Sequence, residues 1–85
     1  MSRYTAEVRI TPRAGLLDPE GKAVQNALHS LEFEDVEDVR VGRLIRLRLR
    51  ADDDDRARHT AEEMCRRLLA NPVTEDYEIV LEKSS

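Results

Sequence analysis

The chain offers few side chains for nucleophilic chemistry, with one cysteine and two histidines among 85 residues. A cysteine nucleophile needs a neighbouring base and an electropositive, partly open setting. Cys65 instead lies between Met64 and Leu68 on an apolar helical stripe, which favours a buried structural thiol. Two histidines and short loops also argue against a Ser-His-Asp triad. We therefore expect no nucleophile in this chain.

Two groups of polar residues could suggest a metal site. His59 and Glu63 are four residues apart and share one face of a predicted helix, but a stable site usually needs three or four ligands. The run 52–55 is all aspartate, yet it lacks the spaced ligands, central glycine and final glutamate of a calcium-binding loop. We interpret the first group as a surface pair and the second as a helix cap. The three glycines are scattered and form no phosphate-binding loop. The sequence thus predicts no catalytic, cofactor-binding or metal-binding residue.

The one local concentration of basic residues lies in and just before the strand predicted at 44–51. It consists of Arg40, Arg43, Arg46, Arg48 and Arg50. RNA-recognition motifs stack bases on aromatic side chains of such a sheet, but this strand has none. The net charge of the chain is −4, which also argues against nucleic acid. Cross-strand glutamates can pair with the arginines, so we expect a charged sheet face used for subunit contact.

Composition limits the class of protein. The length predicts a single domain over residues 1–85. One cysteine allows no internal disulfide and fits a reducing compartment, so we expect a cytoplasmic protein. No signal peptide is evident, and no apolar stretch approaches the roughly 20 residues that span a bilayer. We expect neither a membrane protein nor a multidomain enzyme.

Changes in hydrophobic periodicity predict six elements. Alternation predicts strands at 4–10, 36–41, 44–51 and 77–81, and 3.6-residue spacing predicts helices after Asp18-Pro19 and after 52–55. The second helix should end near Asn71-Pro72, because the residue before a proline disfavours helix. The expected core residues on the helices are Val24, Ala27, Leu28, Leu31, Ala61, Met64, Cys65, Leu68 and Leu69.

The resulting order is β-α-β-β-α-β. It predicts an α+β, ferredoxin-like fold, in which both helices cover one face of a four-stranded antiparallel sheet. This core is small for its chain entropy, and free strand edges invite pairing between copies. We therefore expect a sheet-mediated homodimer.

Several ordered strings in the chain carry a family resemblance. They are Leu17–Val24, Ala27–Leu31, Asp38–Arg43, Glu63–Cys65, Leu68–Val73 and Glu75–Tyr77. Together they closely resemble the PurS family, the small subunits of phosphoribosylformylglycinamidine synthase. The set LDP-x-G, DVRVG and EMC-x-x-LLANP is specific, and the resemblance covers nearly the whole chain.

The resemblance implies a non-catalytic scaffold in purine biosynthesis. The enzyme converts formylglycinamide ribonucleotide, glutamine and ATP to formylglycinamidine ribonucleotide, glutamate, ADP and phosphate. A synthetase subunit would hold ATP and magnesium, and a glutaminase subunit would release ammonia. The small subunit would form dimers or tetramers and bridge the other two, so that ammonia passes between them. Whether this chain lines the ammonia path stays open.

The motif positions are candidate partner contacts as well as caps, turns and helix ends. They are Leu17, Asp18, Pro19, Gly21, Arg40, Gly42, Arg43, Asn71, Pro72 and Tyr77. Loops 16–21 and 70–75 would touch the partner subunits. The chain departs from the family near Glu32, where we expect a glycine because a left-handed helix cap is favourable there. It departs again at Thr74, where we expect an aliphatic residue.

An ACT-like regulatory domain is the alternative of a different class. Such domains share the predicted element order and admit an amino acid at a glycine in the first strand-to-helix loop. Pro12, Gly15, Leu16 and Leu17 superficially fit that loop. A free-standing enzyme based on Cys65 ranks third.

Overall fold

Three strands and two helices make up the fold of the computed structural model, which describes residues 1–84. The elements are β1 (Ser2–Pro12), α1 (Pro19–Ser30), β2 (Arg43–Ala51), α2 (Asp54–Met64), a π-helical turn (Cys65–Leu69) and β3 (Glu75–Lys83). The predicted α+β class and antiparallel sheet are confirmed. The strands and helices begin and end within a few residues of the predicted boundaries, apart from the segment at 36–41.

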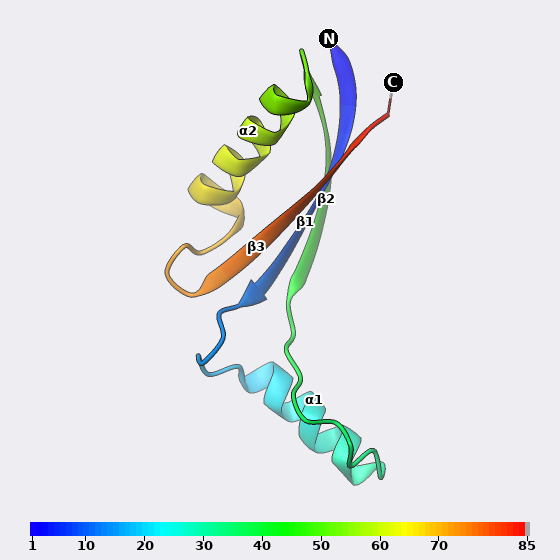
Figure 1. Ribbon diagram of the computed structural model, residues 1–85. Coiled ribbons are helices and arrows are strands. Elements are labelled where there is room, and N and C mark those ends of the chain that lie inside the picture. The colour runs from blue at the N-terminus through cyan, green and yellow to red at the C-terminus, as the bar shows by residue number, and fades with distance from the viewer. Residues whose placement is uncertain (85) are drawn as a thin grey trace.

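The sheet is antiparallel in the order β2-β1-β3, and α2 lies across one face of it (Figure 1). The central strand β1 points Tyr4, Ala6, Val8 and Ile10 into that layer, and all four are fully buried. The corresponding side chains of the two outer strands are only half-buried. A single helix therefore covers the middle of the sheet and leaves its flanks partly open.

Helix α1 does not lie on the sheet. Together with the segment that returns along it, the helix forms a limb (the α1 limb, residues 19–42) that extends beyond the end of the sheet (Figure 1). The chain measures 51 × 27 × 14 Å and has a radius of gyration of 16.4 Å, whereas a compact domain of this length has about 12 Å. The predicted core role of the α1 stripe is therefore wrong for the single chain. Leu31 is 67% exposed, and Val24 and Ala27 are exposed as well.

The strand predicted at 36–41 is absent, and the sheet has three strands instead of four. The backbone of this segment bonds to α1 side chains and not to a neighbouring strand. Gln25 Nε2 donates to the Glu37 carbonyl over 3.1 Å, and His29 Nε2 lies 2.8 Å from the Val36 carbonyl oxygen. Because side chains satisfy these backbone groups, alternation of apolar residues does not place the segment in the sheet.

The helix boundaries follow local chemistry. Asp53 caps α2 by accepting from the Arg56 amide over 2.8 Å, as predicted from the aspartate run. The end of α2 widens into a π-helical turn, closed by the Ala70 amide on the Cys65 carbonyl at 3.0 Å. The wider turn shifts the side chains within it around the helix axis. Leu68, expected in the core, is consequently 83% exposed.

Candidate functional site

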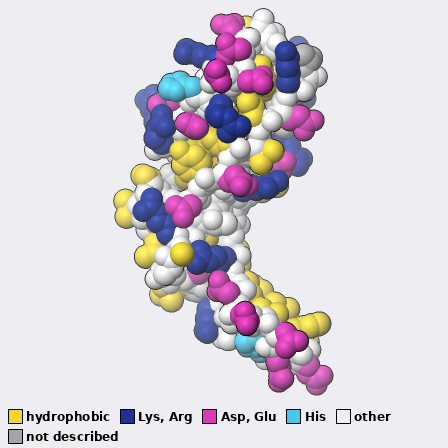
Figure 2. All heavy atoms as spheres, viewed as in Figure 1, with side chains coloured by type: hydrophobic (Ala, Val, Ile, Leu, Met, Phe, Trp, Pro, Cys, Tyr) yellow, Lys and Arg dark blue, Asp and Glu magenta, His cyan; other side chains and the backbone are white. Residues whose placement is uncertain are grey.

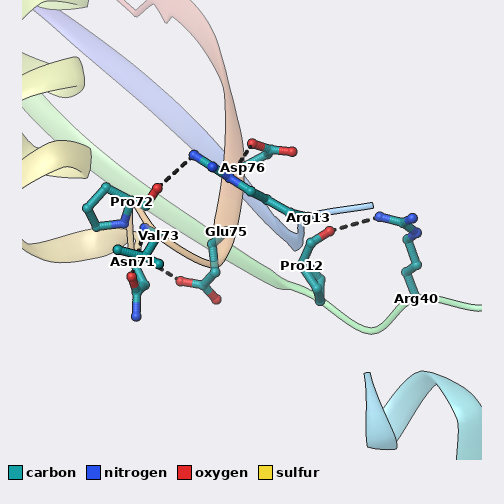
Figure 3. Close-up of polar contacts among 8 residues, drawn as sticks. All are labelled: Pro12, Arg13, Arg40, Asn71, Pro72, Val73, Glu75 and Asp76. Atoms are coloured by element: carbon teal, nitrogen blue, oxygen red, sulfur yellow. Dashed lines mark hydrogen bonds and ion pairs between the residues drawn. The ribbon is translucent and has the colours of Figure 1, made fainter. Parts of the chain in front are cut away.

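The connections between elements meet at one end of the sheet. We call this region the loop junction and define it as residues 12–18, 39–43 and 68–76. Side-chain hydrogen bonds and ion pairs join the three segments there (Figure 3). The sheet supplies the end of β1 and the starts of β2 and β3, so the junction is built on rigid elements.

Arg13 joins the first segment to the third. Its amide donates to the Thr74 carbonyl over 2.9 Å, and its Nη2 donates to the Pro72 carbonyl over 2.6 Å. Its Nε also lies 3.3 Å from Asp76 Oδ1. Arg40 joins the second segment to the first, because its Nη1 donates to the Pro12 carbonyl over 2.9 Å. Two arginines thus hold three loops in one arrangement.

Glu75 organises the turn that precedes β3. Its Oε1 accepts from the Asn71 amide and from Arg43 Nη2, each over 2.8 Å. These bonds, the Asn71 amide first, hold the pKa of Glu75 below its usual value of 4.5. Arg43 also donates to the Leu69 carbonyl over 3.1 Å, and Asn71 Oδ1 accepts from the Val73 amide. The turn is therefore held by hydrogen bonds within itself and by hydrogen bonds to the first residue of β2.

Asp18 anchors the α1 limb at the junction. Its two carboxylate oxygens accept from different backbone amides, Oδ1 from Gly21 over 3.1 Å and Oδ2 from Val41 over 3.0 Å. Both bonds stabilise the ionised carboxylate and lower the pKa of Asp18. A Cβ on Gly21 would collide with the Val39 carbonyl oxygen and would lie 2.5 Å from Asp18 Oδ2. Glycine at this position lets the returning segment lie directly against the start of α1.

The junction exposes apolar side chains although its backbone is held in place. Leu17 is 86% exposed, Leu68 83% and Val73 74%. A shallow hollow lies between segments 12–18 and 68–76 of the junction. It is lined by Pro12, Leu16, Leu17, Thr74 and Glu75. Exposed apolar groups on ordered loops, ringed by charged residues, are typical of a protein-binding surface.

Most predicted site residues come together at the junction. These are Leu17, Asp18, Arg40, Gly42, Arg43, Asn71 and Pro72, and Pro19 and Gly21 begin the adjoining helix. Gly42 permits close approach, since a Cβ there would collide with the Ile10 carbonyl oxygen. Tyr77 differs from the others, because its side chain is half-buried against the cluster around Val8 and Cys65.

Several of the residues considered for catalysis or metal binding are buried or paired with other groups of the chain. Burial raises the pKa of the Cys65 thiol, which keeps it in the unreactive neutral form. Glu63 pairs with Arg66, and this contact lowers the pKa of the Glu63 carboxyl. Asp54 accepts from the Tyr4 hydroxyl over 2.8 Å. Among residues 1–84, no group of three or more potential metal-ligating side chains comes together.

Sequence reasoning missed three contributors to the junction. Arg13 and Glu75 were not singled out, although each makes several of its bonds. Leu68 was assigned to the core. Arginine and glutamate beside turn residues gave a weak signal for the first two, whereas the π-helical turn that exposes Leu68 has no sequence pattern of its own.

Across the described part of the chain, no helix is both long enough and apolar enough to cross a membrane.

Comparison with known proteins assigns the family. The family model of PurS, phosphoribosylformylglycinamidine (FGAM) synthase, matches residues 5–83. The chain is 41% identical over 80 residues to the PurS subunit of this synthase from Methanocaldococcus jannaschii, covering 94% of this chain and 96% of the relative. It is also 41% identical to the Bacillus subtilis PurS subunit, covering 94% of each chain. These matches favour PurS over the ACT-like alternative.

Solved structures agree with the sequence match. The crystal structure of M. jannaschii PurS, one of the subunits of formylglycinamide ribonucleotide amidotransferase, aligns with a TM-score of 0.84, at 40% identity and over 96% of this chain and 99% of that one. A chain of PurLQS from Thermotoga maritima aligns with a TM-score of 0.88, at 27% identity and over 96% of this chain and all of that one. The chain therefore belongs to the PurS family and is a PurS subunit of phosphoribosylformylglycinamidine synthase, an enzyme of purine biosynthesis.

Proposed function

We propose that this chain is the non-catalytic scaffold of its synthase and that the loop junction contacts the other subunits. In this role it bridges the glutaminase and synthetase subunits and supports transfer of ammonia between them. The observation that carries the proposal is the set of exposed apolar side chains on a pinned surface: Leu17, Leu68 and Val73. The likeness to a chain of PurLQS from T. maritima supports a place within a multi-subunit complex.

The rigidity of the junction supports a docking role. Arg13, Arg40 and Glu75 hold its loops before any partner arrives. A surface that is already ordered loses less conformational entropy on binding than a flexible one. Burial of the exposed leucine and valine side chains against a partner contributes favourable free energy to binding, because apolar surface leaves water. The junction is therefore suited to a stable contact with another protein.

The catalytic work belongs to the other subunits in this proposal. The thiol of Cys65 is buried and neutral, so it is a poor nucleophile for glutamine hydrolysis. Gly21 and Gly42 serve close backbone approach at separate places and do not form a phosphate-binding loop. We therefore assign ATP and magnesium to the synthetase subunit, and we place the complex in the cytoplasm.

Reconstitution tests the bridging role. The chain is mixed with the glutaminase and synthetase subunits, and formylglycinamidine ribonucleotide is measured with glutamine and separately with free ammonia. We expect glutamine-driven turnover to require this chain and ammonia-driven turnover to persist without it. The proposal would be refuted if omitting this chain lowered neither activity and the three subunits formed no complex on a sizing column.

Matched lysine variants locate the contact. Leu17→Lys and Val73→Lys place a charge on the junction, and Val80→Lys places the same charge on the far face of the sheet, opposite Glu7. We expect the first two to lower glutamine-driven turnover at least tenfold and the third to leave it within twofold. An equal effect of all three would show that the junction is not the docking surface.

A further inference from the structure

Three arginines gather on the face of the sheet that points away from α2. Side chains alternate along a strand, so Arg3 of β1 and Arg48 and Arg50 of β2 lie on the side opposite to the buried row of β1. All three residues are exposed, and none of them makes an ion pair within residues 1–84. We call these three residues the arginine cluster.

The register of the sheet brings the three charges together. Arg3 lies directly opposite Arg50, and Thr5 lies directly opposite Arg48. These four positions form a two-by-two block, in which the Cβ atoms of cross-strand neighbours are about 5 Å apart. Glu82 of β3 lies opposite Thr5 on the other side of the block, but it pairs with none of the arginines. Like charges directly opposite each other destabilise a sheet, and proteins break such local rules mainly at functional sites.

Other arginines on the same face have carboxylate partners. Arg9 Nη1 lies 3.2 Å from Glu78 Oε1, and Arg46 Nη2 lies 3.6 Å from Glu7 Oε1. In the view of Figure 2, Lys and Arg side chains over the sheet and α2 lie among Asp and Glu side chains. The cross-strand pairing expected from the sequence therefore accounts for only part of the basic run. The arginine cluster is a local excess of positive charge.

A hollow opens at the arginine cluster. It is lined by Arg3, Arg48, Leu49 and Arg50 and has a volume of about 290 Å³. Pockets that enclose drug-sized ligands begin at about 300 Å³. The hollow therefore has room for a small anion or for one end of a larger ligand, whose remainder would stay in solvent.

We propose that the arginine cluster binds the phosphate group of a small ligand. A guanidinium group is always protonated and presents its N–H donors in a planar fork that matches phosphate oxygens. Three such groups suit a phosphate, which carries close to two negative charges, better than a single carboxylate. The Thr5 hydroxyl, within the same block, adds a further donor. The bound anion also removes the repulsion between Arg3 and Arg50. Inorganic phosphate and a nucleotide both present this group.

Calorimetric titration of the chain with inorganic phosphate, ADP and adenosine tests the site. At low ionic strength, where exposed charges are least screened, we expect ADP to bind with a Kd of about 1 mM or tighter. Adenosine, which lacks phosphate, should give no heat of binding. Inorganic phosphate that binds as tightly as ADP would identify the free ion as the ligand, whereas weaker binding of the free ion would identify a nucleotide. The proposal is overturned if neither binds or if adenosine binds as well as ADP.

Matched glutamine variants assign the binding to the arginine cluster. Arg48→Gln and Arg50→Gln should each weaken ADP binding at least tenfold, whereas Arg9→Gln, which removes a paired arginine of the same face, should leave it within twofold. Because Arg50 lies opposite Arg3, Arg50→Gln should also raise the Tm of the free chain. An equal loss of affinity in Arg9→Gln, or a lower Tm in Arg50→Gln, would contradict the proposal.

The site is independent of the bridging role, because the titrations use this chain alone. An acidic surface of another subunit is the competing occupant of the arginine cluster. If the free chain bound neither phosphate nor ADP and Arg48→Gln prevented assembly with the other subunits on a sizing column, the cluster would be a protein contact and the phosphate site would be refuted.

Discussion

Replacing Gly21 with alanine should loosen the α1 limb, although alanine favours helix. In an open helix this change stabilises by about 1 kcal/mol. Here the new Cβ collides with the Val39 carbonyl oxygen and crowds Asp18 at 2.5 Å from Oδ2. The carbonyl belongs to the backbone and cannot rotate away, so the returning segment must move and strain the bond between the Val41 amide and Asp18. The expected sign is therefore opposite to that of helix propensity.

The magnitude follows from these two opposed effects. Overpacking costs about 1 to 3 kcal/mol, and a clash with backbone belongs at the upper end of that range. Subtracting the helical preference of alanine leaves a net loss of about 2 kcal/mol. Such a loss raises the population of the open limb about 30-fold. Because α1 lies off the sheet, the effect concentrates in the limb and not in the whole chain (Figure 1).

Amide hydrogen exchange measures this opening directly. The Val41 amide, which donates to Asp18, should exchange about 30-fold faster in Gly21→Ala than in the wild type. Asn26→Ala is the matched control, since Asn26 is exposed in the same helix and alanine meets no clash there. Its limb amides should exchange at an unchanged or slower rate. Slower exchange in Gly21→Ala would mean that propensity prevails and that the close approach is not as tight as the structure has it.

Three further predictions concern stability and reactivity. Glu32 has a φ of 75°, so Glu32→Gly should stabilise the chain by about 1 kcal/mol in a thermal melt, and Gly15→Ala, at φ 86°, should do the reverse. Cys65→Ser should leave glutamine-driven turnover of the complex within twofold, and Cys65 should resist alkylation until the chain is unfolded; rapid labelling would contradict its burial. The pKa of Glu75 is lowered on folding, so its contribution to stability is present above its usual value of 4.5 and is lost as the pH falls through the folded value. Glu75→Gln should therefore flatten the acid limb of a stability profile, and an unchanged profile would count against the bonds to Asn71 and Arg43.

Elements with a strong local pattern were predictable from the sequence. Residues 4–10 alternate strictly, and β1 is the buried central strand. The pair Asp18-Pro19 predicts the start of a helix, and the structure confirms it. A glycine was expected near position 32 because a left-handed backbone is favourable there. The backbone at this position is left-handed, although the residue is a glutamate. In each case the cause lies within a few residues and can be read locally.

The position of α1 could not be predicted in the same way. Its apolar stripe shows that one face needs cover, but not whether the cover comes from its own sheet. The segment at 36–41 alternates as a strand does, yet Gln25, His29 and Asp18 take up its backbone groups. These bonds connect residues 7 to 23 positions apart and depend on how the segment returns along the helix. The same holds for the junction, in which Arg13 reaches Pro72 across most of the sequence.

The family-motif residues of this chain hold its backbone in position and do not form a reactive site. Asp18 and Gly21 fix the limb to its own returning segment, and Gly42 lets that segment pass close to the end of β1. Arg40 then ties the returning segment to Pro12, at the edge of the loop junction. The limb and the junction therefore share one set of contacts, although they present different surfaces. A substitution at these anchors should therefore disturb the α1 limb and partner binding together, whereas Leu17→Lys should lower partner binding and leave the limb in place.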